Sequence, residues 1–220
     1  MKRGFRPRLS HGTVAVATAP KVKGHPWFAA TYDLVTWWAE RTLLRQLRSR
    51  VVSQATGTVL ELGAGTGANF PYYPAAERII ATEPDLFMLR RAKKQAQALG
   101  LDVDLHQGLA EALPFSEASC DTVVSTLVLC TVAVPDRALA ETKRVLKPGG
   151  AFRFIEHVRA DGWTGMVQDK LTPAWRWFGA GCHLNRRTAA AIEAAGFQIV
   201  ELEQRRLGPT PLLIGVAQPT

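Results

Sequence analysis

A glycine-rich turn directly after a short apolar strand constrains the fold of this chain more than any other feature. Residues 59–68 read VLELGAGTGA. Glycine lacks a Cβ atom, so these positions can adopt left-handed dihedral angles and bring backbone N–H groups close to a ligand. We therefore expect a buried strand that ends in a ligand-binding turn, and we expect that turn to open a helix.

Strand and helix signals alternate after this turn. Short apolar runs predict strands at 58–62, 78–82, 103–106, 121–126 and 151–157. Asp85 is the predicted N-cap of a helix that stops at Gly100, and a second helix is predicted from Pro135 to Leu146. Buried, β-branched strands that alternate with helices are typical of an α/β domain whose parallel sheet has helices on both faces.

The C-terminal part of the chain departs from this alternation. A helix is predicted at 188–195, and strands are predicted at 197–204 and 212–217. Because no helix separates these two strands, they should pair antiparallel. The preceding segment 162–187 is rich in tryptophan and too irregular for the alternation, so we interpret it as an insertion that lies over the substrate side.

Positive charge is concentrated near the N-terminus. The formal net charge is +8, and the first 50 residues hold all of this excess, with ten Lys and Arg residues against two acids. We expect residues 1–25 to form a basic, disordered arm and residues 26–220 to form a single domain that begins with a helical lid at 26–56. Nucleic acid is not an expected partner, since a nucleic-acid-binding core would carry the charge itself. The arm is either a solvated tail or makes peripheral contact with an anionic membrane surface.

Length and composition exclude other classes of protein. A chain of 220 residues can bury a core without disulfides or a metal, and it contains no apolar run of about 18 residues that would span a membrane. The three cysteines, Cys120, Cys130 and Cys182, lack the spacing of a zinc or redox site. We therefore predict no metal site, interpret the cysteines as core residues without a partner, and expect a cytoplasmic location.

Two nucleotide cofactors are compatible with the glycine-rich turn. Gly63, Gly65 and Ala68 also satisfy the fingerprint of NAD-binding proteins, and Glu83, after the second predicted strand, could accept hydrogen bonds from the ribose hydroxyls of either cofactor. The long helix predicted at 27–54 and the antiparallel pair at the end of the sheet are not usual in NAD-binding domains. These two features favour a methyltransferase.

The chain resembles the class I S-adenosylmethionine-dependent methyltransferases. Residues 61–67 (ELGAGTG), 110–115 (AEALPF) and 144–150 (RVLKPGG) resemble motifs of the group that includes the ubiquinone/menaquinone C-methyltransferases. Further segments resemble the methyltransferase-like alkyl thiol methyltransferases, namely GANF at 67–70, TLVLC at 126–130, GGAF at 149–152, EHV at 156–158, PAW at 173–175 and GCHL at 181–184. Those relatives carry an apolar N-terminal anchor, whereas this arm is basic.

This resemblance implies a fold and a reaction. The fold is a Rossmann-like α/β domain with a mostly parallel seven-stranded sheet and an antiparallel C-terminal strand. The methyl donor is S-adenosyl-L-methionine, the product is S-adenosyl-L-homocysteine, and the acceptor is a small molecule. The implied cofactor-binding residues are Tyr32, Gly63, Ala64, Gly65, Asn69, Glu83, Pro84, Ala110, Glu111, Thr126 and Leu127.

Individual roles follow from the same resemblance. Glu83 holds the ribose, Ala110 and Glu111 border the adenine, and Tyr32 closes the pocket. Asn69 either reaches the cofactor or caps a helix.

Two histidines are candidates for catalysis. A sulfonium donor is already activated, so the protein chiefly aligns the acceptor nucleophile with it. His157, at the end of the fifth predicted strand, is the first candidate to deprotonate or orient the acceptor, and His183 is the second; a structural role for either stays open. We expect methyl transfer to a small apolar acceptor such as a thiol. O-, N- or C-methylation of a quinone, phenol or lipid headgroup, and cofactor binding without turnover, are the alternatives.

Overall fold

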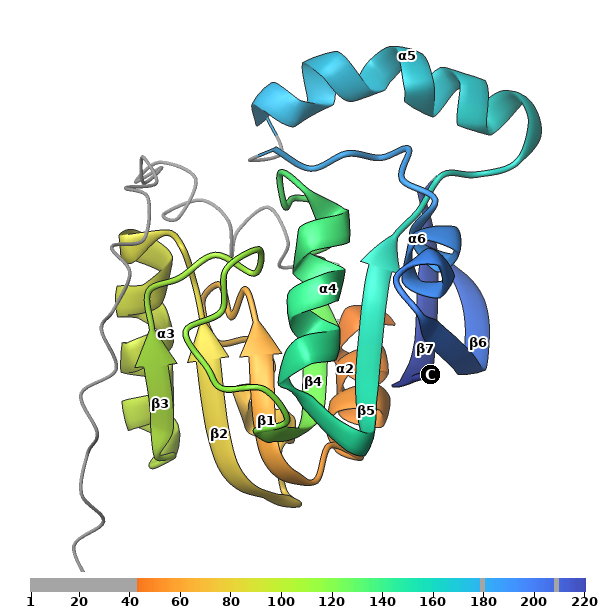
Figure 1. Ribbon diagram of the computed structural model, residues 1–220. Helices are drawn as coiled ribbons and strands as arrows, with labels where there is room; N and C mark the ends of the chain where they lie inside the picture. The colour runs from red at the N-terminus through yellow and green to blue at the C-terminus, as the bar shows by residue number, and fades with distance from the viewer. Residues whose placement is uncertain (1–42, 179–180, 208–209) are drawn as a thin grey trace, which may run out of the picture.

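The computed structural model describes residues 43–178, 181–207 and 210–220, and within them seven strands form one sheet in the order β3-β2-β1-β4-β5-β7-β6. The strands are β1 (Gly57–Leu62), β2 (Ala76–Thr82), β3 (Val103–His106), β4 (Cys120–Thr126), β5 (Leu146–His157), β6 (Phe197–Leu207) and β7 (Thr210–Pro219). Strands β1 to β5 are parallel, and β7 pairs antiparallel with both β5 and β6 (Figure 1). The predicted α/β fold, mostly parallel with an antiparallel C-terminal strand, is confirmed.

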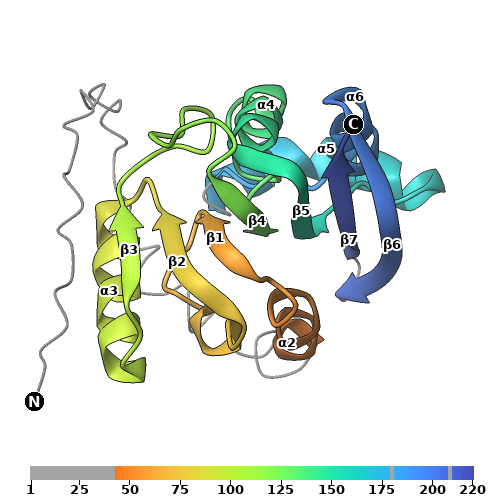
Figure 2. The same ribbon diagram turned by 60° about the horizontal axis from the view of Figure 1, so that its bottom comes forward.

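Helices cover both faces of this sheet. The described helices are α2 (Arg45–Val52), the short 3-10 helix η2 (Phe70–Tyr72), α3 (Leu86–Leu99), α4 (Pro135–Val145), α5 (Gly162–Phe178) and α6 (Thr188–Ala194). Figure 2 shows α2 and α3 on one face and α4 and α6 on the other. Buried side chains of α4 and α6 form one hydrophobic cluster with the sheet, and those of α3 and the end of α2 form another on the opposite face. The fold is therefore held by two apolar layers, one on each side of the strands.

The ends of α3 follow from local sequence chemistry. The Asp85 side chain accepts hydrogen bonds from the backbone N–H groups of Phe87 and Met88, and Gly100 closes the helix with a φ of 66°. A carboxylate at the N-cap satisfies amides that have no partner within the helix, and glycine adopts the left-handed C-terminal position without a Cβ penalty. Both predicted boundaries of this helix are confirmed.

The glycine-rich turn does not open a long helix, so that prediction was wrong. Only the three residues of η2 are helical after the turn. Pro71 is tolerated in the first turn, but Pro74 offers no backbone N–H to continue the helix, and Tyr73 before it has φ −105° and ψ 59°, outside the helical region. The two prolines therefore end the helix almost as soon as it begins.

The segment after β5 is more regular than expected. Residues 162–178 form the continuous helix α5, which lies above the carboxyl end of β5 at the top of Figure 1. Pro173 inside the helix and glycines near its start hide the helical pattern from a reading of the sequence. The position of α5 is compatible with the predicted insertion over the substrate side.

Several predictions fall on residues outside the described ranges. The basic arm at 1–25, Tyr32 and most of the helix predicted at 27–54 lie there, and α2 corresponds only to the last part of that helix. Within the described residues, no helix combines the length and apolar character that crossing a bilayer would need.

Candidate functional site

The predicted site residues follow strand ends along one edge of the sheet. Because β1, β2, β4 and β5 are parallel, their carboxyl ends meet at the same edge, which is at the top of Figure 1. The glycine-rich turn follows β1, Glu83 follows β2, Leu127 follows β4 and His157 ends β5. This edge is where open α/β sheets bind their ligands.

The geometry of the glycine-rich turn fits a bound nucleoside. Gly63, Gly65 and Gly67 have φ values of 55°, 58° and 86°. A Cβ atom at Gly63 would lie 2.7 Å from the Val128 side chain, so this glycine permits close packing within the protein. A Cβ atom at Gly65 would meet nothing within 4 Å, so a ligand could approach that backbone. The Ala64 N–H donates to the Thr82 carbonyl at 2.9 Å and ties the turn to β2.

Glu83 lies directly beside this turn. Its Oε2 accepts a hydrogen bond from the Gly65 N–H at 2.9 Å, and its Oε1 accepts one from the Asp85 N–H at 2.9 Å. Burial raises the pKa of Glu83, and these two backbone donors oppose the rise. Each carboxylate oxygen has a further lone pair. The carboxylate of Glu83 is therefore fixed next to the open side of Gly65.

A buried polar network lies below the turn. Arg48 donates to Asn69 Oδ1 at 2.7 Å, and Asn69 Nδ2 donates to Glu61 Oε1 and Thr126 Oγ1, each at 3.1 Å. The Tyr73 hydroxyl donates to Glu61 Oε2 at 2.8 Å. Burial raises the pKa of Glu61 to about 7, against the lowering effect of its hydrogen bond from Tyr73. Asn69 does not cap η2, which removes one of its two predicted roles, and its side chain instead links β1 to β4.

Sequence reasoning missed Glu61 as a member of this network. The signal was present, since a glutamate within the apolar run VLELG must find polar partners when the strand is buried. Arg48 carried no comparable signal, because arginine in a helix is mostly found on the solvent-exposed face.

The residues predicted to border the adenine have partners of their own. The Ala110 side chain is buried. Glu111 Oε1 accepts hydrogen bonds from the N–H groups of Ala133 and Val134, at 2.8 and 3.3 Å, at the start of α4. The Pro84 carbonyl accepts a bond from Gln107 at 3.1 Å. Glu111 thus stabilises the start of α4, in addition to any role towards the cofactor.

The turn after β4 is held by a buried carboxylate on β5. Leu127 has a φ of 59°, and its N–H donates to the Ile155 carbonyl at 2.7 Å. Glu156 accepts hydrogen bonds from the Ser125 hydroxyl at 2.6 Å and from the N–H groups of Val128 and Cys130 at 3.1 and 3.3 Å. Its two oxygens fix the turn that carries Cys130.

Cys130, His157 and Cys182 lie together at the carboxyl ends of β4 and β5. One donor atom from each of the three residues lies within 4.8 Å of the others, and Cys182 Sγ is 3.8 Å from His157 Nδ1. Both cysteines are buried and neither forms a disulfide. Contact with Cys130, and then the His157 ring, lowers the pKa of Cys182 to about 5, whereas contact with Cys182 and burial raise the pKa of Cys130. Cys130 and Cys182 are buried in one apolar cluster with Leu184, as expected for core cysteines, and their side chains also contact each other.

His183 braces the Cys130 turn. Its backbone N–H donates to the Cys130 carbonyl at 2.7 Å. Its ring Nδ1 lies 3.2 Å from that carbonyl and 3.2 Å from the Arg186 guanidinium. Arg186 also donates to the carbonyls of Leu129 and Val132. Burial, and then the charge of Arg186, lower the pKa of His183, which favours its neutral form. These contacts account for His183 structurally without assigning it a catalytic step.

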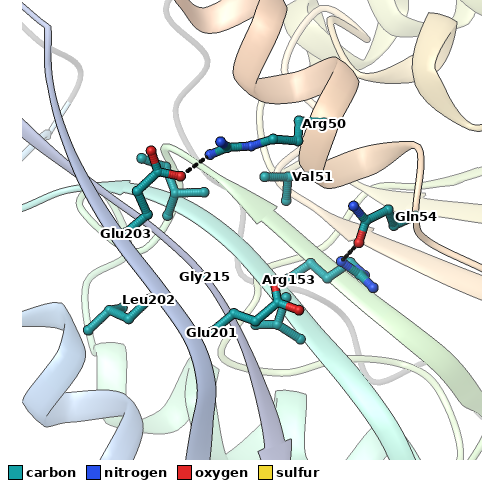
Figure 3. A pocket seen from close by; sticks show the side chains of 10 residues that line it. Arg50, Val51, Gln54, Arg153, Glu201, Leu202, Glu203 and Gly215 are labelled. Carbon is teal, nitrogen blue, oxygen red and sulfur yellow. Dashed lines mark hydrogen bonds and ion pairs between the residues drawn. The ribbon is translucent and has the colours of Figure 1, made fainter.

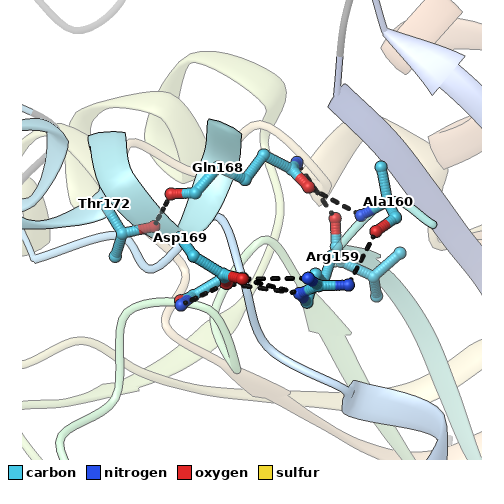
Figure 4. Close-up of polar contacts among 7 residues, drawn as sticks. Arg159, Ala160, Gln168, Asp169 and Thr172 are labelled. Carbon is cyan, nitrogen blue, oxygen red and sulfur yellow. Dashed lines mark hydrogen bonds and ion pairs between the residues drawn. The ribbon is translucent and has the colours of Figure 1, made fainter. Parts of the chain in front are cut away.

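Helix α5 is tethered to the end of β5. Arg159 Nη2 is 2.9 Å from Asp169 Oδ2, and Gln168 Oε1 accepts a hydrogen bond from the Ala160 N–H at 2.6 Å (Figure 4). The other side of the helix exposes large apolar side chains, including Trp163 at 72% of its surface. Trp163 does not pack in the core of the described chain.

A cavity of about 420 Å³ lies elsewhere, between α2 and the middle of β5, β6 and β7 (Figure 3). Arg50 forms an ion pair with Glu203 there, and Arg153 donates a hydrogen bond to Gln54. None of the predicted cofactor-binding or catalytic residues lines it. It is therefore not the candidate site.

Comparison with known proteins identifies a shared domain. A family profile described as a methyltransferase domain matches residues 60–154. The human thiol S-methyltransferase TMT1B is 34% identical over 178 residues, which cover 79% of this chain and 72% of the relative. Human TMT1A is 35% identical over 188 residues, which cover 80% and 74%. A demethylmenaquinone methyltransferase of Renibacterium salmoninarum is 35% identical over 132 residues, covering 60% of this chain and 54% of the relative.

Solved structures agree in fold at lower sequence identity. A methyltransferase of Aquifex aeolicus described as dependent on S-adenosylmethionine has a TM-score of 0.61 at 17% identity, over 89% of this chain and 100% of that one. The YcgJ protein of Bacillus subtilis has a TM-score of 0.66 at 18% identity, over 80% and 98%. At such identities the likeness concerns the fold alone.

Proposed function

The chain belongs to the S-adenosylmethionine-dependent methyltransferases, the family of its TMT1 relatives, and we propose that it methylates the sulfur atom of a small apolar thiol. S-adenosyl-L-methionine supplies an activated methyl group on a sulfonium sulfur, and S-adenosyl-L-homocysteine is the product. The observation that supports a thiol as the acceptor is sequence identity. The chain is 34% and 35% identical to two thiol S-methyltransferases, over most of their length and of its own.

The methyl donor is proposed to bind at the carboxyl ends of β1, β2 and β4. In our proposal, Gly63, Ala64 and Gly65 contact the methionine and ribose portion through their backbone, and Glu83 accepts hydrogen bonds from the ribose hydroxyls. The open side of Gly65 and the buried carboxylate beside it support this placement. The remaining proposed contacts are made by Tyr32, Asn69, Pro84, Ala110, Glu111, Thr126 and Leu127.

The acceptor is proposed to lie beyond the end of β5, near His157. A thiol attacks as its thiolate, so the site must favour that anion and align its sulfur with the donor methyl group. His157 is half-buried at this edge, close to two cysteine sulfur atoms, which supports a direct role towards the acceptor sulfur. His183 is the alternative candidate, and its contacts favour a role in holding the Cys130 turn.

Where the protein works is a separate proposal. We expect a cytoplasmic protein whose basic arm contacts an anionic membrane surface, with no nucleic-acid partner. The exposed apolar side of α5, which includes Trp163, Met166 and Leu171, supports access to apolar acceptors at such a surface. Sedimentation with anionic and with neutral lipid vesicles tests this proposal, and equal recovery of protein with both would contradict it.

The acceptor is tested by incubating the full chain with methyl-labelled donor and a set of acceptors. The set contains an alkyl thiol and an alcohol, amine, phenol and quinol of similar size. We expect label on the thiol. Transfer only to the phenol, amine or quinol would contradict the thiol proposal and favour the O-, N- or C-methylating alternatives. Calorimetric binding of the donor without transfer to any acceptor would favour cofactor binding without turnover.

A further inference from the structure

We propose that Cys130, His157 and Cys182 bind one zinc ion, and that the fourth coordination position of this ion takes the sulfur of the acceptor. The identity of the acceptor rests on the function proposed above, whereas the zinc site rests on the geometry of this chain. The three residues come from three separate segments, the turn after β4, the end of β5 and the loop after α5.

The spacing of the donor atoms suits a tetrahedral metal. Zinc binds sulfur at about 2.3 Å and imidazole nitrogen at about 2.0–2.1 Å, so two ligand atoms of one ion lie roughly 3.5–3.8 Å apart. Cys182 Sγ and His157 Nδ1 are separated by 3.8 Å, and all three donor atoms lie within 4.8 Å of one another. Small side-chain movements would therefore complete the three-ligand geometry.

The chemistry of the donors selects the kind of metal. Two thiolates and one imidazole are ligands that zinc prefers and that calcium and magnesium do not. The nearest buried carboxylate, Glu156, accepts hydrogen bonds from Ser125, Val128 and Cys130 and is engaged in the protein. Catalytic zinc sites characteristically have three protein ligands and one position open to a substrate.

Hydrogen bonds from surrounding residues hold the cysteine turn in place. Glu156 binds the Cys130 N–H, the His183 N–H binds the Cys130 carbonyl, and Arg186 binds the carbonyls of Leu129 and Val132. Such outer contacts orient metal ligands and tune the metal in known sites. They also place the positive charge of Arg186 close to both cysteines, where it offsets the negative charge of the thiolates.

The site is adjacent to the expected position of the methyl donor. Cys130 follows the end of β4, and β4 pairs with β1, which carries the glycine-rich turn. Thr126 on β4 is linked to that turn region through the Asn69 side chain at 3.1 Å. An acceptor bound at Cys130, His157 and Cys182 would lie at the same sheet edge as the donor, so the two reactants could meet.

The proposed step balances without an oxidant or a reductant. The acceptor thiol binds the zinc ion as a thiolate and releases its proton to solvent, because a coordinated thiol is deprotonated. The acceptor sulfur then forms a bond to the methyl carbon as the bond from that carbon to the sulfonium sulfur breaks. The electron pair of the broken bond stays on S-adenosyl-L-homocysteine, and the methylated thioether, a weaker ligand than a thiolate, leaves the ion.

Metal content of the purified full chain tests the site directly. Protein produced with added zinc should hold about one zinc per chain by elemental analysis, and cobalt in its place should give a sulfur-to-cobalt charge-transfer band. Cys130→Ala and Cys182→Ala should each lose the band, while Cys120→Ala, which removes a buried cysteine outside the cluster, should keep it. A wild-type protein without bound metal or band, or both cluster variants retaining them, would overturn the proposal.

Activity and donor binding separate this inference from the proposed function. Metal-free protein that binds the donor normally should lose at least roughly tenfold in thiol methylation and regain it with zinc. Undiminished thiol methylation without metal would overturn the zinc proposal and leave the proposed function standing. Bound zinc with label transferred only to phenol or amine would support the metal site and contradict the thiol acceptor. Normal donor affinity in the cysteine variants shows that loss of metal is not loss of fold.

Discussion

The buried carboxyl group of Glu61 should make the stability of this protein fall as the pH rises towards neutrality. The pKa of Glu61 is about 7 in the folded chain against an ordinary value of 4.5, and the main cause is burial. Between these two values the folded protein holds a proton that the unfolded chain has released. Stability from this group is therefore fully present below about pH 4.5 and is lost as the pH rises through about 7.

The size of the effect follows from the two pKa values. Each unit of difference corresponds to about 1.36 kcal/mol, so the shift of Glu61 amounts to about 3 kcal/mol of unfolding free energy. Glu61→Gln keeps the shape of the side chain and an oxygen acceptor for Asn69 or Tyr73 but cannot ionise. As the pH rises from about 4.5 to about 8, the unfolding free energy of the variant should increase by about 3 kcal/mol relative to that of the wild type.

Urea unfolding of both proteins at several pH values in this range measures that difference. Other groups titrate too, including Glu83 and Glu156, whose pKa values are also raised by burial. They are present in both proteins, so contributions that are independent of Glu61 cancel in the difference between the two unfolding curves. The charge of Glu83 acts on Glu61, and this coupling is part of the measured difference. Glu77→Gln, on the exposed start of β2, is the matched control and should leave the pH profile parallel to that of the wild type. A difference between wild type and Glu61→Gln that stays constant within about 0.5 kcal/mol across the range would refute the reasoning.

Three further predictions concern the turn, the ribose and α5. Glu83→Ala should weaken binding of the methyl donor by about 1–3 kcal/mol in calorimetry, and unchanged affinity would show that the ribose lies elsewhere. Gly63→Ala should destabilise the fold by about 1–3 kcal/mol in urea unfolding, because its φ is positive and its Cβ meets Val128. Gly65→Ala carries the same backbone strain without a clash, so it should destabilise the fold less and should also weaken donor binding. Asp169→Ala removes the ion pair with Arg159 and should raise KM for the acceptor more than KM for the donor. Equal changes in the two KM values would argue against a position of α5 over the acceptor.

Local chemistry made most of the fold predictable. The Asp85 cap, the Gly100 stop and the antiparallel pairing of β6 and β7 depend on neighbours in the sequence or on the lack of a connecting helix. Two helix predictions were wrong, because a proline stood against the local pattern in each segment. Pro74 prevented the helix that the glycine-rich turn suggested, and Pro173 hid the helix α5 that exists.

The site was less predictable, because its contacts join distant parts of the chain. Glu83 could be placed from its position after a strand, since strand ends converge in a parallel sheet. The cluster of Cys130, His157 and Cys182 could not, because spacing along the sequence carries no metal signature when three separate segments each supply one donor. The contact between Arg48 and Asn69 could not be predicted for the same reason, because the two residues lie in separate segments.

The alternation of side chains on β5 makes the chemistry of this edge dependent on strand register. Glu156 accepts a hydrogen bond from the backbone N–H of Cys130, in the turn after β4, while the next residue, His157, contacts Cys182. Successive residues of a strand face opposite ways. A slip of β5 by one position would put either Glu156 in the place of His157 or His157 in the place of Glu156, and an apolar residue, Ile155 or Val158, would take the other place. A single inserted or deleted residue in β5 could thus leave a recognisable sheet and still remove the contacts of Glu156 with Cys130 and of His157 with Cys182. The antiparallel ladder from Phe152 to His157 against β7 fixes that alignment from the far side, so it sets the positions of Glu156 and His157 as well as the fold.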